Sequence, residues 1–182
     1  MKKLFSGKKI LVTGGTGSFG HQIVTRLMNE DPEEIRIISR DEKKQYDMQF
    51  EFAGNNKLRF IIGDVRNKES LIKAMRGVDI VFHAAALKQV PSCEYNPYEA
   101  VKTNAEGAQN VIDAALFHNV EKVIAISTDK AAEPVNVMGM TKAIQERLIT
   151  SANVHRDGKR TVFSCVRYGN VLGSRGSVIP VL

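Results

Sequence analysis

The amino-acid sequence predicts an α/β protein whose parallel sheet is doubly wound, with helices on both faces. Short β-branched apolar runs alternate with helical patterns along the chain, and strands that are apolar throughout are typical of a parallel sheet buried on both faces. A glycine-rich stretch follows the first of these runs directly. Right-handed crossovers between such strands give the Rossmann-like arrangement.

Six runs are expected to be strands because each is short and rich in β-branched or aliphatic residues. They occupy residues 9–13, 35–39, 58–62, 78–82, 123–127 and 161–166. A doubly wound sheet binds its ligands at the carboxyl ends of its strands. The residues that directly follow each run are therefore the candidate site residues.

The intervening segments have helical patterns. Helices are expected at 17–30, 41–52, 70–75, 101–115 and 140–154. Ile23 and Leu27 lie on the apolar face of the first, and Gly77 closes the short third helix, as glycine commonly does. The fourth and longest has one apolar face, with spacings of four, three, four and three residues: Val101, Ala105, Ala108, Ile112 and Ala115.

Length and composition predict one domain over 1–182 and exclude several classes of protein. The chain has 182 residues, a net charge of +6 and scattered basic residues without interleaved aromatic residues, so a solvated surface is expected rather than nucleic-acid binding. There is no apolar run of membrane-spanning length, and the charged start does not resemble a secretory signal. Cys93 and Cys165 form no CxxC and the histidines form no HExxH, so no metal site is expected. These features favour a cytoplasmic protein without a membrane partner.

The stretch from Thr13 to Gly20 reads TGGTGSFG and satisfies both GxGxxG and GxxGxxG. Glycines allow a tight turn and a close approach of the backbone to a pyrophosphate, and the following helix N-terminus offers N–H groups. Its place between a strand and a helix supports dinucleotide binding over a purely structural turn. The expected contacts are Gly14, Thr16, Gly17, Ser18, Phe19 and Gly20.

The end of the second strand bears on the choice of dinucleotide. Arg40 stands there with Lys43 and Lys44 behind it, and an arginine at this place accommodates a 2′-phosphate, whereas an acidic residue holds a ribose diol. NADP is therefore expected, while Asp41 keeps NAD open. After the third strand, Asp64 could accept from an adenine amino group or only start a turn, with Val65 beside it.

The remaining strand ends complete the candidate site. Small residues after the fourth strand would let the backbone run under a flat cofactor, whereas His83 is expected to be structural. A hydroxyl, a carboxylate and an amine follow the fifth strand, where an active site belongs. After the sixth strand, an aromatic residue and an amide suit ring and substrate contacts, and an arginine suits a phosphate. The candidates are Ala84, Ala85, Ala86, Lys88, Thr128, Asp129, Lys130, Tyr168, Asn170, Ser174 and Arg175.

Together these segments resemble the extended short-chain dehydrogenase/reductase family. The resemblance adds Asn104 in the long helix and a YxxxK helix in which the lysine is Lys142. Within that family the sequence is similar to the configuration-inverting UDP-N-acetylglucosamine 4,6-dehydratases of capsule, O-antigen and flagellin-glycan synthesis, nearest the capsular (CapE-like) branch. The segments 13–20, 82–91, 127–132 and 167–171 carry this similarity. The usual YxxxK tyrosine is Met138, which the capsular branch shares.

The resemblance implies a lyase reaction on a UDP-sugar, with internal hydride transfer through NADP. It implies that Lys130 is the C5 base, that Asp129 is the acid for the C6 hydroxyl, and that Thr128 binds the C4 oxygen. Lys142 would hold the nicotinamide ribose, and Asn104 and Tyr168 would contact the cofactor. Lys88 is expected to contact the cofactor and the substrate, although it could instead reach only solvent. The acid role of Asp129 requires an apolar or anionic setting that raises its pKa. A homo-oligomer is also implied.

Two other functions remain open. A nucleotide-sugar epimerase or reductase of the same fold would need a tyrosine at 138 and would not need the Asp129–Lys130 pair. A non-catalytic NADP-binding protein is favoured by length, because family members run to about 330 residues and have a C-terminal substrate portion that is missing from 1–182. The expectation is NADP binding with poor turnover by this chain alone.

Overall fold

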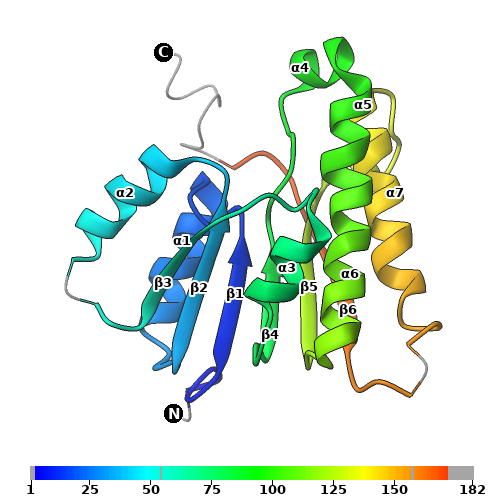
Figure 1. The fold of residues 1–182 in the computed structure, drawn as a ribbon. Helices are drawn as coiled ribbons and strands as arrows, with labels where there is room; N and C mark the ends of the chain where they lie inside the picture. The colour runs from blue at the N-terminus through cyan, green and yellow to red at the C-terminus, as the bar shows by residue number, and fades with distance from the viewer. Residues whose placement is uncertain (1–2, 54, 157, 172–182) are drawn as a thin grey trace.

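The structure is a computed structural model that describes residues 3–53, 55–156 and 158–171. Six strands form one parallel sheet in the order β3-β2-β1-β4-β5-β6 (Figure 1), which confirms the predicted Rossmann-like fold. The strands are β1 Lys9–Thr13, β2 Glu34–Ser39, β3 Leu58–Ile62, β4 Ile80–His83, β5 Lys122–Thr128 and β6 Val162–Tyr168. The strand order reverses between β1 and β4, where such sheets place their ligands.

The helices lie on the two faces of this sheet (Figure 1). One face is covered by α1 Ser18–Met28 and α2 Glu42–Glu51. The other face is covered by α3 Lys68–Ala74, α6 Gly107–His118 and α7 Val137–Ser151. Shorter elements are α4 Val90–Tyr95, α5 Pro97–Ala100, the π-helix η1 Val101–Glu106 and the 3₁₀-helix η2 Asp129–Ala131.

Helix capping explains two differences between the expected and the observed helix boundaries. The α2 helix begins after Asp41, whose carboxylate accepts from the backbone N–H of Lys44 at 3.0 Å. The α7 helix begins at Val137 rather than at the expected 140, because the Asn136 side chain accepts from the Gly139 N–H at 2.8 Å. Satisfying an otherwise unpaired N–H group in this way defines a helix start.

The long helix after β4 also differs from its expected form. Its first six residues form a π-helix before α6 continues, although Ala105, Ala108, Ile112 and Ala115 are buried as the spacing predicts. The short helices α4 and α5 were not expected. Each has a proline in its first turn, a position that tolerates proline because its N–H has no helical partner.

Two hydrophobic clusters hold the layers together, one on each side of the sheet. Leu11, Val81 and Val123 pack with residues of α3, α6 and α7, whereas Val12 and Ile37 pack with residues of α1 and α2. Strand β6 is not apolar throughout as expected. It alternates, with Phe163 buried on the α7 side and its intervening residues exposed, because the second cluster is built around β1, β2 and β4.

The parallel register brings the ends of neighbouring strands to one level. Thr13 of β1 pairs with Ile38 of β2 and His83 of β4, and Thr128 of β5 pairs with Tyr168 of β6. The segments that follow these strands therefore leave the sheet along one edge. Among the described residues, no helix has both the length and the apolar character that a membrane crossing requires.

Candidate functional site

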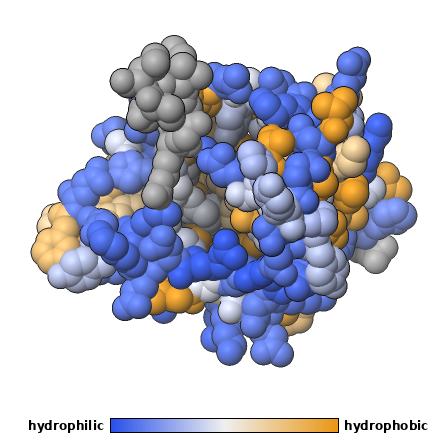
Figure 2. Space-filling model, turned by 90° about the horizontal axis from the view of Figure 1, so that it is seen from above, coloured by the Kyte–Doolittle hydropathy of each residue, from blue (hydrophilic) through white to orange (hydrophobic). Residues whose placement is uncertain are grey.

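A cleft of about 1780 Å³ lies along the carboxyl edge of the sheet and is lined by residues that follow all six strands. Figure 2 looks down on the molecule from this side and shows mostly hydrophilic residues there. Most of the predicted cofactor residues line it: Gly14, Gly17, Ser18, Phe19, Gly20, Arg40, Asp64, Val65, Ala84, Ala85, Ala86, Lys88, Lys142 and Tyr168. Thr16, Lys43 and Asn104 do not line it. Ser174 and Arg175 lie outside the described residues.

The glycine-rich turn is packed so closely that side chains are excluded. Gly14 has φ +65°, and a Cβ there would lie 2.8 Å from the Ala85 backbone. A Cβ at Gly20 would collide with the carbonyl oxygen of Gly14. The turn leads into α1, whose N-cap Gly17 supplies no side-chain acceptor. N–H groups in a helix's first turn have no intrahelical partners, so this end of α1 is suited to an anion.

Lys44, not Lys43, faces the cleft after β2. The Lys43 ammonium is bonded to Asp47 at 2.7 Å on the exposed side of α2, whereas Lys44 lines the cleft and pairs with Asp41 at 2.9 Å. The structure therefore does not bring Lys43 to the cleft. The position where α2 starts determines which lysine faces the cleft, because Lys43 and Lys44 are neighbours and project from different sides of the helix.

Asn104 is held by hydrogen bonds within the protein and does not line the cleft. It is fully buried, and its side-chain amide accepts from the Leu87 N–H at 2.8 Å and donates to the Leu87 carbonyl at 3.0 Å. It also bonds the Thr141 hydroxyl at 3.0 Å. Asn104 thus ties the loop after β4 to α7. Thr16 is half-buried in the glycine turn without lining the cleft.

The acidic side chains near the end of β2 and β3 are already engaged. Asp41 caps α2 and pairs with Lys44. Asp64 accepts hydrogen bonds from Arg66 and lies 3.7 Å from Arg40. Burial works to raise the pKa of Asp64, but the bonds from Arg66 and the charge of Arg40 hold it below its usual range. Of the two interpretations of Asp64, its bond to the Arg66 N–H fits the turn residue.

The three residues after β5 form a connected polar corner. Asp129 accepts from the Thr128 hydroxyl at 2.8 Å and from the Lys130 ammonium at 3.3 Å. The Lys130 ammonium also donates to the Asn170 side chain at 3.2 Å. Lys130, Thr128 and Asn170 line the cleft, whereas Asp129 lies beside it with its side chain more than half exposed. A Cβ at Gly139 would press on the Lys130 carbonyl, so the start of α7 packs directly against this corner.

The electrostatic setting of Asp129 is opposite to the one expected for an acid. The hydrogen bond from Thr128 and then that from Lys130 lower the pKa of Asp129 below its usual range. Both donors favour the ionised carboxylate. In this structure the corner therefore holds an ion pair between Asp129 and Lys130.

Lys142 enters the cleft from α7 and is almost entirely buried. Its ammonium donates to the Ile126 carbonyl and, at 2.8 Å, to the side chain of Gln145. Burial lowers the pKa of Lys142 to about 8. Met138 lies one turn earlier on the same helix, is 5% exposed and also lines the cleft. A thioether at this place can neither take nor give a proton at neutral pH.

Thr103 is a candidate that the sequence analysis missed. Its side-chain oxygen is buried and has no hydrogen-bond partner among the described residues, and Thr103 lines the cleft. A buried hydroxyl without a partner is costly, which suggests that a ligand completes it. Its position next to Asn104 was the only sequence signal.

His83 is buried below the cleft, as a structural histidine would be. Its Nδ1 lies 2.8 Å from the Thr13 hydroxyl, and its Nε2 has no partner. Burial, with a smaller effect of the charge on Lys142, lowers the pKa of His83 to about 3. His83 is therefore neutral at physiological pH.

The rings of Phe19 and Tyr168 are stacked, with centroids 5.3 Å apart and planes 10° apart. Both residues line the cleft. The pair joins the start of α1 to the end of β6, which are far apart in the sequence. Burial raises the pKa of Tyr168, so its hydroxyl is protonated at neutral pH.

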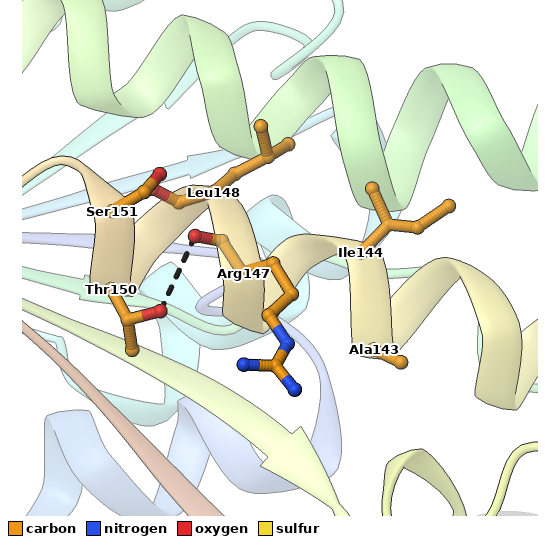
Figure 3. A pocket seen from close by; sticks show the side chains of 6 residues that line it. All are labelled: Ala143, Ile144, Arg147, Leu148, Thr150 and Ser151. Atoms are coloured by element: carbon orange, nitrogen blue, oxygen red, sulfur yellow. Dashed lines mark hydrogen bonds between the residues drawn. The ribbon is translucent and has the colours of Figure 1, made fainter.

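A second hollow of about 600 Å³ lies on α7 and is lined by Ala143, Ile144, Arg147, Leu148, Thr150 and Ser151 (Figure 3). All of these residues belong to one helix, and the Thr150 hydroxyl is bonded to the Arg147 carbonyl. The hollow therefore brings together no residues from different elements of the fold. No cluster of three or more potential metal ligands occurs among the described residues.

Comparison with known proteins places these features in a family. The family model described as polysaccharide biosynthesis protein matches residues 10–182. An uncharacterized membrane protein of Methanocaldococcus jannaschii, MJ1061, is 53% identical over all of this chain and 54% of its own length. A UDP-glucose 4-epimerase of Rickettsia canadensis is 54% identical over 98% of this chain and 53% of its own length. The chain thus spans about half the length of the curated relatives it matches.

Solved structures agree with the fold. Pen from Bacillus thuringiensis has 48% identity and a TM-score of 0.96 over 97% of this chain and 55% of its own. DesIV of Streptomyces venezuelae, a dTDP-glucose 4,6-dehydratase solved with NAD and TYD bound, has 22% identity and a TM-score of 0.77 over 87% of this chain and 55% of its own, a likeness that shows the fold alone. The match over residues 10–182 shows that the chain belongs to the polysaccharide biosynthesis protein family.

Proposed function

We propose that this chain binds NADP in the cleft and carries the catalytic groups of a UDP-N-acetylglucosamine 4,6-dehydratase that inverts C5. The observation that carries the proposal is the corner of Thr128, Asp129 and Lys130, joined to Asn170 and packed on the start of α7. The relatives are nearly twice as long as this chain. We therefore propose that 1–182 is the dinucleotide-binding unit and that the further portion of such proteins supplies most sugar contacts.

The residues of the cleft fit a dinucleotide. The Gly14–Gly20 turn excludes side chains where a diphosphate would lie against the start of α1. Thr103 offers a buried hydroxyl that has no protein partner. DesIV, whose fold is similar, was solved with NAD bound. Bound here, a nicotinamide dinucleotide would supply the acceptor and donor of hydride for the sugar.

The charges after β2 favour NADP over NAD. Asp41, the group that would hold a ribose diol, is engaged by α2 and by Lys44. Arg40 is half-exposed in the cleft lining, and within the described part of the chain its ion pair is with Asp64 at 3.7 Å. Lys44 also lines the cleft. A guanidinium and an ammonium here suit a 2′-phosphate.

The corner after β5 supplies the proton transfers of the proposed reaction. When C4 of the sugar is a ketone, the C5–H bond breaks, Lys130 takes the proton, and the electron pair passes to the C4 oxygen. Thr128 donates to that oxygen. As the enolate collapses, the C6–O bond breaks and Asp129 protonates the departing hydroxyl, which leaves as water. The elimination leaves a C5=C6 double bond, to which a bound reduced nicotinamide would return hydride at C6. Protonation of C5 from the opposite face then inverts that carbon.

For these roles, a proton must move from Lys130 to Asp129 within the ion pair of the resting site. Lys130 must be uncharged to accept a proton, and Asp129 must be protonated to give one. Moving one proton over the 3.3 Å between the Lys130 nitrogen and Asp129 gives both forms at once. Substrate that displaces water from the exposed carboxylate would favour this neutral pair, since burial disfavours charge.

A nucleotide-sugar 4-epimerase is the second candidate, because the Rickettsia canadensis relative is named as one. Met138 supports the dehydratase, since its buried thioether cannot serve as the tyrosinate base that an epimerase or reductase of this fold would use. The Asp129–Lys130 pair supports it further, because epimerisation at C4 needs no acid for C6. A non-catalytic NADP-binding role requires only the cleft.

The test uses a hybrid in which 1–182 replaces the matching part of the Methanocaldococcus jannaschii relative. With UDP-N-acetylglucosamine and NADP⁺, we expect NMR to show a 6-deoxy-4-keto product. Lys130→Ala should reduce C5 hydrogen exchange with solvent about a hundredfold or more. Lys68→Ala, which removes an exposed lysine paired with Asp113, is the matched control.

Each outcome separates the candidates. A 4-epimer as the product would favour the epimerase and contradict the dehydratase. Binding of NADP⁺ without any sugar product would favour the non-catalytic role. Normal C5 exchange in Lys130→Ala would remove Lys130 from the mechanism even if the product is the keto sugar.

A further inference from the structure

Gln145 is a fully buried polar side chain directly behind the cleft. It lies on α7, three residues after Lys142, and its exposed fraction is zero. Glutamine is mostly an exposed residue, and residues three apart on a helix are neighbours on its surface. Gln145 does not line the cleft. Because Gln145 is buried and does not reach the cleft, any role it has in ligand binding acts through another residue.

The hydrogen bonds of Gln145 form a closed ring with Lys142. The Gln145 Oε1 accepts from the Lys142 ammonium at 2.8 Å, and the Gln145 Nε2 donates to the Ile126 carbonyl at 3.1 Å. The Lys142 ammonium donates to the same Ile126 carbonyl. The ring thus joins α7 to β5, two residues before Thr128.

An ammonium group has three N–H donors, and the ring uses two of those of Lys142. Because Lys142 lines the cleft, its remaining donor is available to a ligand there. We infer that Gln145 is a positioning residue that fixes the Lys142 ammonium against the Ile126 carbonyl, so that one N–H serves a dinucleotide in the cleft. This inference rests on the proposed function.

A neutral amide is the only one of the similar side chains that can close this ring. Gln145 accepts from Lys142 and donates to Ile126 at once. Glutamate would accept from the ammonium but could not donate to the carbonyl, and methionine could do neither. Substitution by each of these residues therefore removes a different part of the ring at nearly constant volume.

The other charged and titratable groups around Lys142 come from three elements. Glu146 lies on α7, Cys165 on β6 and His83 on β4. Glu146 is bonded to Ser127 and to Arg167, with which it pairs at 2.6 Å. Cys165 and Glu146 work to raise the pKa of Lys142, but burial outweighs them and lowers it. Gln145 is the neutral partner in this setting.

The first measurement needs no bound dinucleotide. The chain is labelled with ¹³C at lysine Cε, and the Lys142 signal is assigned by its loss in Lys142→Met. We expect it to titrate near pH 8 in the unsubstituted chain. Gln145→Met removes an acceptor that favours the charged form, so the midpoint should fall. Gln145→Glu adds an opposite charge, so the midpoint should rise.

The second measurement is the affinity for NADP⁺ at pH 7. Gln145→Met should weaken it roughly tenfold, because the ammonium loses a charge-assisted bond that fixes it. In the unsubstituted chain, affinity should fall as pH rises through about 8, and in Gln145→Glu this fall should move to higher pH. If Gln145 had only a structural role, its substitution would not change the pH at which the affinity falls.

Asn153→Ala is the matched control. The Asn153 amide lies two residues past the end of α7, donates to the Thr150 carbonyl of that helix, and makes two 2.9 Å bonds to the Phe163 backbone of β6. Asn153→Ala should lower stability. It should leave unchanged both the Lys142 titration and the pH dependence of the NADP⁺ affinity. Unchanged Lys142 titration in both Gln145 variants, or an equal change in Asn153→Ala, would overturn the inference. If the unsubstituted chain does not bind NADP⁺, the proposed function fails, and the NMR titration still decides the role of Gln145.

Discussion

Replacing Lys142 with methionine should make the chain's stability less dependent on pH while removing a donor from the cleft. Lys142 is only 6% exposed, and burial lowers its pKa from 10.5 to about 8. Methionine has nearly the same shape but carries no charge. The substitution therefore removes one buried ammonium and leaves the surrounding residues in place.

The magnitude follows from linkage between protonation and folding. Below pH 8 the lysine is charged in both the folded and unfolded chain, and the folded chain bears the full cost of the buried charge. At about 1.4 kcal/mol per pH unit, the lowering from 10.5 to about 8 corresponds to about 3 kcal/mol. Between pH 8 and 10.5 the unfolded chain binds more protons, so this contribution to the free energy of unfolding rises by that amount.

The assay is urea unfolding of both proteins between pH 7 and 10.5. Other groups titrate alike in the two proteins, so the difference in unfolding free energy isolates Lys142. We expect the variant's free energy of unfolding, relative to the unsubstituted chain, to fall by about 3 kcal/mol from pH 7 to 10.5. Lys68→Met, at an exposed and ion-paired lysine, should show no such trend.

A difference that stays constant over this pH range would refute the reasoning, because it would mean that Lys142 has an ordinary pKa in the folded chain. A difference that changes in the opposite sense would mean that a charge partner outweighs burial. The bonds from the Lys142 ammonium to Ile126 and Gln145 favour its charged form and so oppose the effect of burial.

Three further predictions concern the cleft. Thr103→Val should weaken NADP⁺ binding about two- to tenfold in calorimetric titrations without lowering stability, since its hydroxyl has no protein partner; a stability loss would reveal a structural role. Arg40→Ala should weaken NADP⁺ about tenfold or more and change NAD⁺ affinity little, and equal losses would contradict 2′-phosphate binding. Gly20→Ala should cost about 1–3 kcal/mol in urea unfolding, because its Cβ meets the Gly14 carbonyl, and unchanged stability would show that the turn can open.

Most of the fold could be predicted because the signals are local. All six strands were found within a few residues, since each is a short apolar run bounded by polar or glycine residues. The short helices α4 and α5 were missed because each has few residues and a proline at its start. The exposed face of β6 was not predicted, because whether a helix covers a strand depends on segments elsewhere in the chain.

The site was predicted at the level of strand ends. The rule that parallel strands place ligands at their carboxyl edge selected Thr128, Lys130 and Tyr168, and the structure brings all three to one cleft. The rule does not say which way a side chain points, so it could not tell that Lys44 faces the cleft whereas Lys43 does not.

The sequence by itself determined the order of elements, the glycine turn and the residues that leave the sheet at its carboxyl edge, because these depend on spacing and on local backbone preferences. Only the tertiary structure decided which polar groups are already paired. It engaged Asp41 and Asn104 within the protein, made Asp129 the ionised partner of Lys130, and left the Thr103 hydroxyl without a partner. Hydrogen bonds between residues distant in the chain, and the burial that makes them matter, arise only when the sheet and helices pack together.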